Sequence, residues 1–224
     1  MKVVIFGASG MVGQGVLLEC LRDTGVESVL VIGRSAIAQQ HAKVREVLVK
    51  DLFDVASYAD ELTGLDACFF CLGVSSAGVS EEAYRRLTYD LTVSIAQQLA
   101  TRSPALCFVF VSGASTDNTE RGRTMWARVK GAAENALLKM PFRSAFMFRP
   151  GVIQPLDGIR SKTRAYRLAY VFMAPIMPLL RWAFPNSVLT TREIGRAMLV
   201  VARKGWPQAV LETKDIHAAA TRNR

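Results

Sequence analysis

Three glycines near the amino terminus are spaced in a way that suits phosphate binding. They lie between a β-branched run, Lys2 to Phe6, and a helical pattern from Met11 to Arg22. In such a loop the first glycine allows a tight turn, the second lets the backbone approach a pyrophosphate, and the third lets helix and strand pack closely. Amides at the start of the helix then face the phosphates. We expect the whole loop to bind a dinucleotide: Gly7, Ala8, Ser9, Gly10, Met11, Val12 and Gly13.

The end of the second predicted strand, Ser28 to Ile32, bears on which dinucleotide binds. Gly33 is followed there by Arg34 and Ser35, without an acidic residue. An acid at this place would bind the free ribose 2′-hydroxyl of NAD, whereas a base suits the 2′-phosphate of NADP. The sequence therefore predicts NADP and makes NAD the less favoured cofactor.

The next two predicted strands supply further candidate contacts. Asp51 and Leu52 follow the third strand, Val44 to Val49, and would reach the adenine. The fourth strand, Asp66 to Leu72, ends in a group that would line the ribose and phosphates: Cys71, Leu72 and Gly73.

The alternation of strands and helices up to Arg149 is typical of a parallel sheet covered on both faces. It continues with a long amphipathic helix, a fifth strand, another helix and a sixth strand: Ser80 to Thr101, Leu106 to Val111, about Thr124 to Lys139, and Ser144 to Phe148. The sequence predicts an α/β fold, a doubly wound and mostly parallel Rossmann sheet of six or seven strands, with a small helical C-terminal region on the substrate side. We expect one domain, with a nucleotide-binding core over 1–155 and a substrate-side lid with closing helices over 156–224.

Five motifs in a fixed order support a family resemblance. They are GASGMVG, CLG after the fourth strand, VSGAS after the fifth, WARVKGAAEN in the helix and RPGVI after the sixth. Over residues 1–155, and more loosely over the helix near Thr190 to Arg203, the chain resembles the atypical short-chain dehydrogenases/reductases. Its branch is that of nucleoside-diphosphate-sugar epimerases and Tat-interacting-protein-like oxidoreductases. The resemblance implies an NADP(H)-binding oxidoreductase or epimerase acting on a carbonyl or hydroxyl substrate.

The resemblance also implies catalytic and nicotinamide-binding residues. Active members use a Tyr-x-x-x-Lys pair on this helix, in which tyrosine moves the proton, lysine lowers its pKa and holds the ribose, and a serine after the fifth strand fixes the carbonyl. Lys130 matches the lysine, and Ser112 or Ser115 matches the serine. The turn after the sixth strand would lie beside the nicotinamide: Pro150, Gly151 and Val152.

Trp126 stands where the family has its tyrosine. An indole N–H donates a hydrogen bond but does not titrate near neutral pH, so it is no general acid. Losing a general acid typically costs about 10²–10⁴ in rate. Water, Ser115, Thr124 or the C-terminal segment could supply the proton instead. The alternative is a non-catalytic protein that senses NADP(H) and reports it to a partner.

The basic excess of the chain is concentrated in its C-terminal third. Of a net charge of +9, residues 1–156 hold 16 basic and 15 acidic residues, and residues 157–224 hold 12 and 4. This asymmetry favours an anionic partner, either an anionic small-molecule substrate or an acidic membrane surface, with a solvated basic face as the alternative. The basic and apolar segment over 160–184 has three interpretations: a substrate lid, an amphipathic element on a membrane, or a homodimer face or core. The sequence contains no nucleic-acid-binding motif, and we expect no nucleic-acid partner.

Cysteine and apolar patterns bear on the compartment. The four cysteines lie in apolar runs, and the thiols of Cys68 and Cys71 are expected on opposite faces of one strand, which argues against a metal or redox pair. His41 and His217 suggest no metal site either. No secretory signal precedes the first strand, and the strongest apolar stretch, Leu168 to Leu180, is too short to span a bilayer. We therefore expect a cytoplasmic protein with reduced thiols.

Overall fold

The computed structural model describes residues 1–159 and 187–222. Its centre is a seven-stranded sheet in which every neighbouring pair is parallel. The spatial order is β3 (Val44–Leu48), β2 (Ser28–Gly33), β1 (Lys2–Phe6), β4 (Ala67–Phe70), β5 (Cys107–Val111), β6 (Ser144–Arg149) and β9 (Val210–Glu212). The chain winds one way from β1 to β3 and the other way from β4, which opens a crevice at the carboxyl ends of β1 and β4. The predicted doubly wound Rossmann sheet is confirmed.

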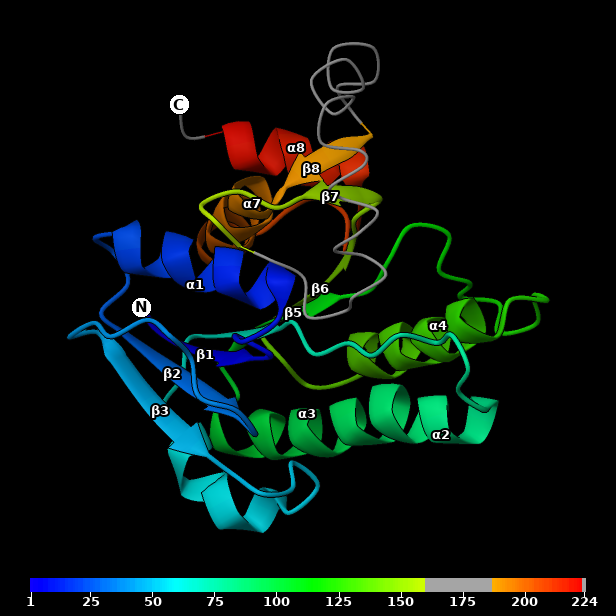
Figure 1. Ribbon diagram of the computed structural model, residues 1–224, viewed down its shortest axis with the longest axis horizontal. Coiled ribbons are helices and arrows are strands. Elements are labelled where there is room, and N and C mark those ends of the chain that lie inside the picture. Colours follow the sequence, from blue (N-terminus) through cyan, green and yellow to red (C-terminus); the bar gives the residue numbers. More distant parts are fainter. Residues whose placement is uncertain (160–186, 223–224) are drawn as a thin grey trace.

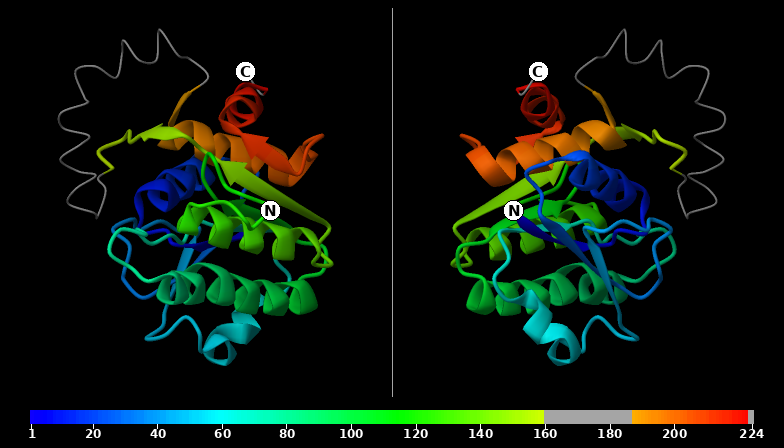
Figure 2. Two further views of the ribbon diagram at one scale, coloured as in Figure 1. Left: turned by 90° about the vertical axis from the view of Figure 1, so that its right-hand side faces the viewer. Right: turned by 90° about the vertical axis from the view of Figure 1, so that its left-hand side faces the viewer.

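Helices cover both faces of this sheet (Figures 1 and 2). One face carries α1 (Met11–Arg22), α7 (Thr191–Lys204) and α8 (Thr213–Thr221). The other face carries α2 (Glu81–Arg85), α3 (Leu91–Arg102) and α4 (Met125–Leu138). A π-helical stretch, Arg86–Asp90, joins α2 to α3, so the predicted helix from Ser80 to Thr101 forms with a local widening in its middle.

The core follows from the alternation of side chains along buried strands. In β1, Val3 and Ile5 pack under α1 and α7, whereas Val4 and Phe6 face α3 and α4. Successive side chains of a strand point to opposite faces, so a strand covered on both sides must be apolar throughout. Accordingly β4 and β5 have no exposed residue.

The C-terminal part of the described chain is built into the same core. A two-stranded parallel ladder joins β7 (Val152–Gln154) to β8 (Val188–Thr190), and α7 follows directly. Thr190 and Glu193 form a capping box that starts this helix. α7 then packs on α1, and β9 extends the sheet beside β6. The closing elements thus belong to the sheet as well as to the substrate side.

Some elements were not predicted, and one predicted region is outside the described residues. The residue pattern does not indicate the 3₁₀ helix at Val55–Leu62, the helix α8, or the strands β7, β8 and β9, which have three residues each. The lid, membrane and dimer interpretations of 160–184 fall on residues that the structure does not describe. In the part that it does describe, no helix is long and apolar enough to cross a membrane.

Candidate cofactor and active site

The glycine loop joins β1 to α1 and leaves the helix start open to a ligand. Gly7 has a φ of +82°, and a Cβ there would lie 2.7 Å from the Cys71 backbone. A Cβ at Gly13 would lie 2.1 Å from the Gly7 carbonyl oxygen, so this glycine permits the close packing of helix on strand. The first turn of α1 contains no acidic residue, and no side chain caps it. Its unpaired amides and the helix dipole therefore favour an anion at this point.

This loop forms one wall of a cavity of about 540 Å³ at the carboxyl ends of the central strands. Most of the predicted site residues line it: Gly7, Ala8, Ser9, Gly10, Met11, Val12, Arg34, Ser35, Leu52, Cys71, Leu72, Gly73, Ser112, Lys130, Pro150 and Gly151. Seven lining residues were not predicted: Val31, Ile32, Gly33, Val74, Ser75, Val111 and Ile153. These seven lie within three residues of predicted positions, so extending each predicted group by one to three residues would have found them.

Four predicted site residues do not line the cavity. Gly13 packs against Gly7, as its expected role requires. Asp51 accepts a hydrogen bond of 3.0 Å from the Phe53 amide, which directs its carboxylate into its own turn. Ser115 is exposed with a left-handed φ of 68°, and Val152 is 41% exposed while its neighbour Ile153 faces the cavity. The structure thus brings Ser112, and not Ser115, next to Lys130.

Arg34 marks one end of the cavity. Its exposed side chain follows β2, and Ser35 beside it also lines the cavity. No acidic side chain pairs with Arg34 within 1–159 and 187–222. The guanidinium is therefore available to an anionic ligand.

Lys130 marks the other end of the cavity. Its Nζ donates to the carbonyl oxygens of Val111 at 3.2 Å and Ser112 at 3.0 Å, and lies 5.6 Å from the centre of the Phe110 ring. Burial lowers the pKa of this ammonium to about 8, against a smaller opposing effect of the Glu134 carboxylate. The helix α4 thus presents a lysine that can lose its proton near neutral pH.

Ser112 takes part in a short chain of hydroxyl groups. Its Oγ lies 2.7 Å from Thr116 Oγ1, which donates to the Gly113 carbonyl oxygen at 2.7 Å. Because the Thr116 proton is directed to that carbonyl, the proton between the two hydroxyls comes from Ser112. In this arrangement Ser112 Oγ can accept a hydrogen bond from a ligand in the cavity.

Trp126 lies one helical turn before Lys130 on α4. A Cβ added to Gly113 would lie 3.7 Å from its ring, so the indole covers the backbone that follows β5. Trp126 does not line the cavity formed by the described residues. Its ring supports the wall behind Ser112 instead of offering a group to the ligand.

A buried ion pair behind the site escaped the sequence analysis. Arg149 donates to both carboxylate oxygens of Glu134, from Nε at 3.1 Å and from Nη2 at 2.6 Å. Arg149 also contacts Asn118 and Glu212. Burial lowers the pKa of its guanidinium, but the carboxylates of Glu134 and Glu212 together raise it above its ordinary value. Glu134 follows Lys130 by four residues on α4, so this pair ties the lysine's helix to the turn after β6. The sequence signal that could have revealed this pair is Arg149 itself, a charged residue at the end of the apolar strand β6.

The cysteines behave as core residues. Cys68 packs on the α3 and α4 side of the sheet and Cys71 on the α1 side, as strand periodicity predicts. Burial raises the pKa of the Cys71 thiol to about 12, so this lining residue stays protonated at neutral pH.

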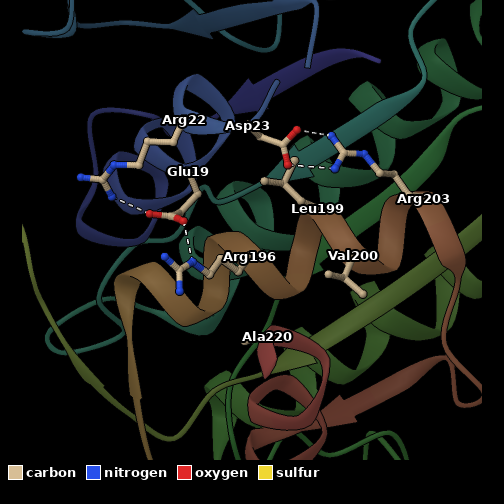
Figure 3. Close-up of a pocket in the computed structure, with 8 residues that line it drawn as sticks. All are labelled: Glu19, Arg22, Asp23, Arg196, Leu199, Val200, Arg203 and Ala220. Atoms are coloured by element: carbon tan, nitrogen blue, oxygen red, sulfur yellow. Dashed lines mark hydrogen bonds and ion pairs between the residues drawn. The ribbon is translucent and has the colours of Figure 1, made fainter. Parts of the chain in front are cut away.

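Two arginines of α7, Arg196 and Arg203, pair with acids of the protein in a second cavity of about 530 Å³ between α1, α7 and α8 (Figure 3). Arg196 donates to Glu19 at 2.9 Å, and Arg22 donates to the same carboxylate at 2.5 Å. Arg203 and Asp23 form a two-bonded pair at 2.5 and 2.8 Å. These pairs give part of the basic excess of the C-terminal third a structural role.

The chain is similar to known proteins in sequence and in fold, although no family model matches it. It is 28% identical over 157 residues to the protein FMP52, mitochondrial, of Eremothecium gossypii, covering 68% of this chain and 66% of that protein. It is also 28% identical over 154 residues to the protein HTATIP2 of Rattus norvegicus, covering 68% of this chain and 62% of that protein. The matches therefore span just under two thirds of these relatives' length.

Solved structures of nucleotide-binding enzymes share the fold. MoeE5 in complex with UDP-glucose and NAD matches 95% of this chain and 75% of its own, with a TM-score of 0.69 and 19% identity. The Bordetella bronchiseptica enzyme WbmF in complex with NAD+ matches 97% and 76%, with a TM-score of 0.67 and 15% identity. At these identities the likeness shows that the chain shares the fold of these NAD-bound proteins.

The comparisons correct one expectation and support another. Several relatives are named mitochondrial proteins, which contradicts the expectation of a cytoplasmic protein. Cysteine usage shows only that the thiols can stay reduced, and it does not separate one reducing compartment from another. The predicted resemblance, in contrast, agrees with both the relatives and the fold. The chain is therefore similar in sequence to FMP52 and HTATIP2, and it has the Rossmann fold.

Proposed function

We propose that the protein binds NADP(H) in the cavity at the carboxyl ends of β1 and β4, and that it is an oxidoreductase or epimerase of a carbonyl or hydroxyl substrate. One observation carries the proposal. A single cavity joins the uncapped start of α1, an unpaired arginine and a lysine of lowered pKa. Those three features suit a pyrophosphate, a 2′-phosphate and a reacting oxygen.

The residues present fit such a cofactor. Gly7 and Gly13 keep the loop so tight that side chains at either position would collide with backbone. No lining residue among those described is acidic, so the phosphates would meet no opposing charge. The substrate would enter from the side of Ser112, Pro150 and Ile153.

Different residues along the cavity would bind different parts of the cofactor. A bound nicotinamide supplies or accepts a hydride. The amides of 8–12 would hold the diphosphate, and Arg34 and Ser35 the 2′-phosphate. Lys130 would face the reacting oxygen at the nicotinamide end of the cavity. Pro150 and Gly151 would wall the ring and exclude water from one of its faces.

Calorimetric titration with NADPH tests the phosphate site. Gly10 is the informative position because its φ is −84° and a Cβ there would meet only the Gly7 oxygen, at 3.3 Å. Gly10→Val should therefore fold, yet place methyl groups over the helix-start amides and weaken NADPH binding at least tenfold. Unchanged binding in Gly10→Val, or no binding of either dinucleotide by the natural protein, would remove the proposal.

The choice of NADP over NAD is tested at Arg34. Arg34→Ala should weaken NADPH about tenfold or more, since a charge-assisted hydrogen bond contributes about 1.5–3 kcal/mol, and should change NADH little. Arg45→Ala is a matched control, because Arg45 is an exposed arginine of the neighbouring strand β3 that pairs with Glu61 and does not line the cavity. Equal losses for both dinucleotides in Arg34→Ala would refute the 2′-phosphate assignment.

Turnover separates an enzyme from a sensor. We expect NADPH oxidation with at least one member of a panel of aldehydes, ketones and quinones. Dinucleotide binding with no turnover across such a panel would favour the NADP(H)-sensing alternative that Trp126 raises.

A further inference from the structure

The cavity contains few groups that could give a proton to a substrate. Of its described lining residues, only Arg34, Cys71 and Lys130 carry a titratable side chain. An arginine keeps its proton at any physiological pH. Cys71 is held protonated by burial, with a pKa of about 12. Lys130 is the group left.

The position of Lys130 suits proton donation. Two of its three N–H groups are directed to the carbonyl oxygens of Val111 and Ser112, and these fix the Nζ atom at the end of β5. No third acceptor is present within the described ranges, and Lys130 lines the cavity. One N–H is thus left for a ligand oxygen.

The neighbouring polar groups cannot take this role in the observed arrangement. The hydroxyl proton of Ser112 points to Thr116, and Thr116 points to Gly113, so this chain of hydroxyls runs away from the cavity. The Trp126 indole is packed against Gly113 and has no titratable proton. On α4, Lys130 is therefore the group that can replace the usual tyrosine of the resembled family as proton donor.

We propose that Lys130 is the proton donor of this site, giving its Nζ proton directly to the substrate oxygen. This rests on the proposed oxidoreductase or epimerase function. In the reducing direction the carbonyl carbon gains a hydride, with its two electrons, from the reduced nicotinamide of the proposed cofactor, and in the oxidising direction the hydride returns to the oxidised ring. The carbonyl oxygen takes the proton, which leaves Lys130 as a neutral amine that regains a proton from water. In the oxidising direction the neutral amine accepts the alcohol proton.

The surroundings of Lys130 set the pH at which it acts. Burial favours the neutral amine, whereas the Glu134 carboxylate on α4 favours the ammonium. Glu134 is itself held by Arg149 from β6, and Arg149 also pairs with Glu212 of β9. From β5 the lysine meets only carbonyl oxygens and the Phe110 ring. A donor whose pKa lies near the working pH is the most effective kind.

Lys130→Arg separates proton donation from binding. Arginine keeps the positive charge and the donor N–H groups but does not release a proton near neutral pH. We expect NADPH affinity within about fivefold of the natural protein, with kcat/KM lowered by about 10²-fold or more. Lys139→Arg at the exposed end of the same helix is the matched control and should change neither.

A second measurement does not depend on turnover. In lysine-labelled protein saturated with NADPH, the NMR signal that is missing from Lys130→Arg should titrate near pH 8, whereas an ordinary lysine titrates near 10.4. A Lys130 pKa above about 10, full turnover in Lys130→Arg, or no turnover with any carbonyl tested would each overturn the proposal. If the natural protein still binds NADPH in any of these cases, only the proposal for Lys130 is refuted and the cofactor site remains. If the natural protein does not bind NADPH, both the cofactor site and the role of Lys130 are refuted.

Discussion

Lys130 affects the stability of the protein as well as the chemistry of its site. Its pKa is about 8 in the folded protein, mainly because of burial, and about 10.4 in an unfolded chain. At pH values below 8 both states carry the proton, and the folded state bears the cost of a buried charge. Between these two values only the unfolded state holds the proton, so the free energy of unfolding rises with pH.

We therefore expect the natural protein to gain stability over Lys130→Met as the pH rises from 8 to 10. The gain should be on the order of 1–3 kcal/mol, and urea unfolding at several pH values measures it. Loss of the two hydrogen bonds to carbonyls shifts the variant by the same amount at every pH. A difference that stays constant with pH would show that the lysine has an ordinary pKa in the folded protein.

At Asp51 we expect a substitution to leave NADPH affinity unchanged. Its carboxylate is used by the Phe53 amide in its own turn and does not line the cavity. Asp51→Asn keeps an oxygen acceptor for that amide, so NADPH affinity should remain within about twofold by calorimetry. A larger loss would mean that the carboxylate turns toward the nucleotide on binding.

At the scale of elements, one buried carboxylate stands out in the contact between α1 and α7. Glu19 is only 5% exposed, and it receives hydrogen bonds from Arg22 on its own helix and Arg196 on α7 (Figure 3). Removing a buried partner leaves charges without compensation, which costs more than losing an exposed pair.

Glu19→Gln should lower the free energy of unfolding by about 2–3 kcal/mol, as measured by urea denaturation. The control Glu61→Gln breaks only the exposed pair with Arg45 and should cost less than about 1 kcal/mol. Equal effects from the two substitutions would show that the Glu19 cluster is no more than a surface ion pair.

The sequence predicted the elements whose residues follow a strong period. Buried strands such as Lys2–Phe6 and the helix Met11–Arg22 were placed with the bounds that the structure has. The glycine loop and Lys130 were identified because their chemistry depends on residue type and local spacing. Three-residue strands such as Val210–Glu212 are too short to show a period. From the sequence, Ser112 and Ser115 were equally good candidates for the serine of the site. The left-handed turn at Ser115, which the sequence does not reveal, distinguishes the two in the structure.

The contacts that cross the fold could not be predicted from local patterns. Arg149 and Glu134 are fifteen residues apart and meet because β6 and α4 pack together. The arginines of α7 were seen as surplus charge, since their partners Glu19 and Asp23 lie in the first helix. The cytoplasmic expectation failed for a different reason, because composition does not encode a compartment.

At the scale of the whole molecule, cofactor binding and folding should be coupled. The cavity is assembled from the ends of strands β1, β2, β4, β5 and β6 and from the helices α1 and α4, so a dinucleotide binds only when these elements have come together. A ligand that binds only the folded state at 100 times its Kd adds about 2.7 kcal/mol to the free energy of unfolding.

NADPH at that concentration should raise the melting temperature of the natural protein by several degrees. Gly10→Val should show at most about half of this rise at the same concentration, since a tenfold weaker Kd leaves about 1.4 kcal/mol, and Arg45→Ala should match the natural protein. Thermal unfolding monitored by circular dichroism is sufficient. A rise in Gly10→Val equal to that of the natural protein would place the nucleotide somewhere other than the helix start.

The β7–β8 ladder has a consequence for how this protein can vary. Three residues on each side pair in parallel, with Ile153 of β7 facing the cavity and Thr190 of β8 starting α7. Because the ladder is parallel, the intervening stretch leaves β7 beside Thr190 and enters β8 beside Val152, and strand pairing holds both of its ends. Because doubling a closed loop costs only about 0.6 kcal/mol, that stretch can be exchanged for one of different length or polarity while the sheet keeps its order. Substrate preference can then diverge among related chains while the nucleotide site stays as it is.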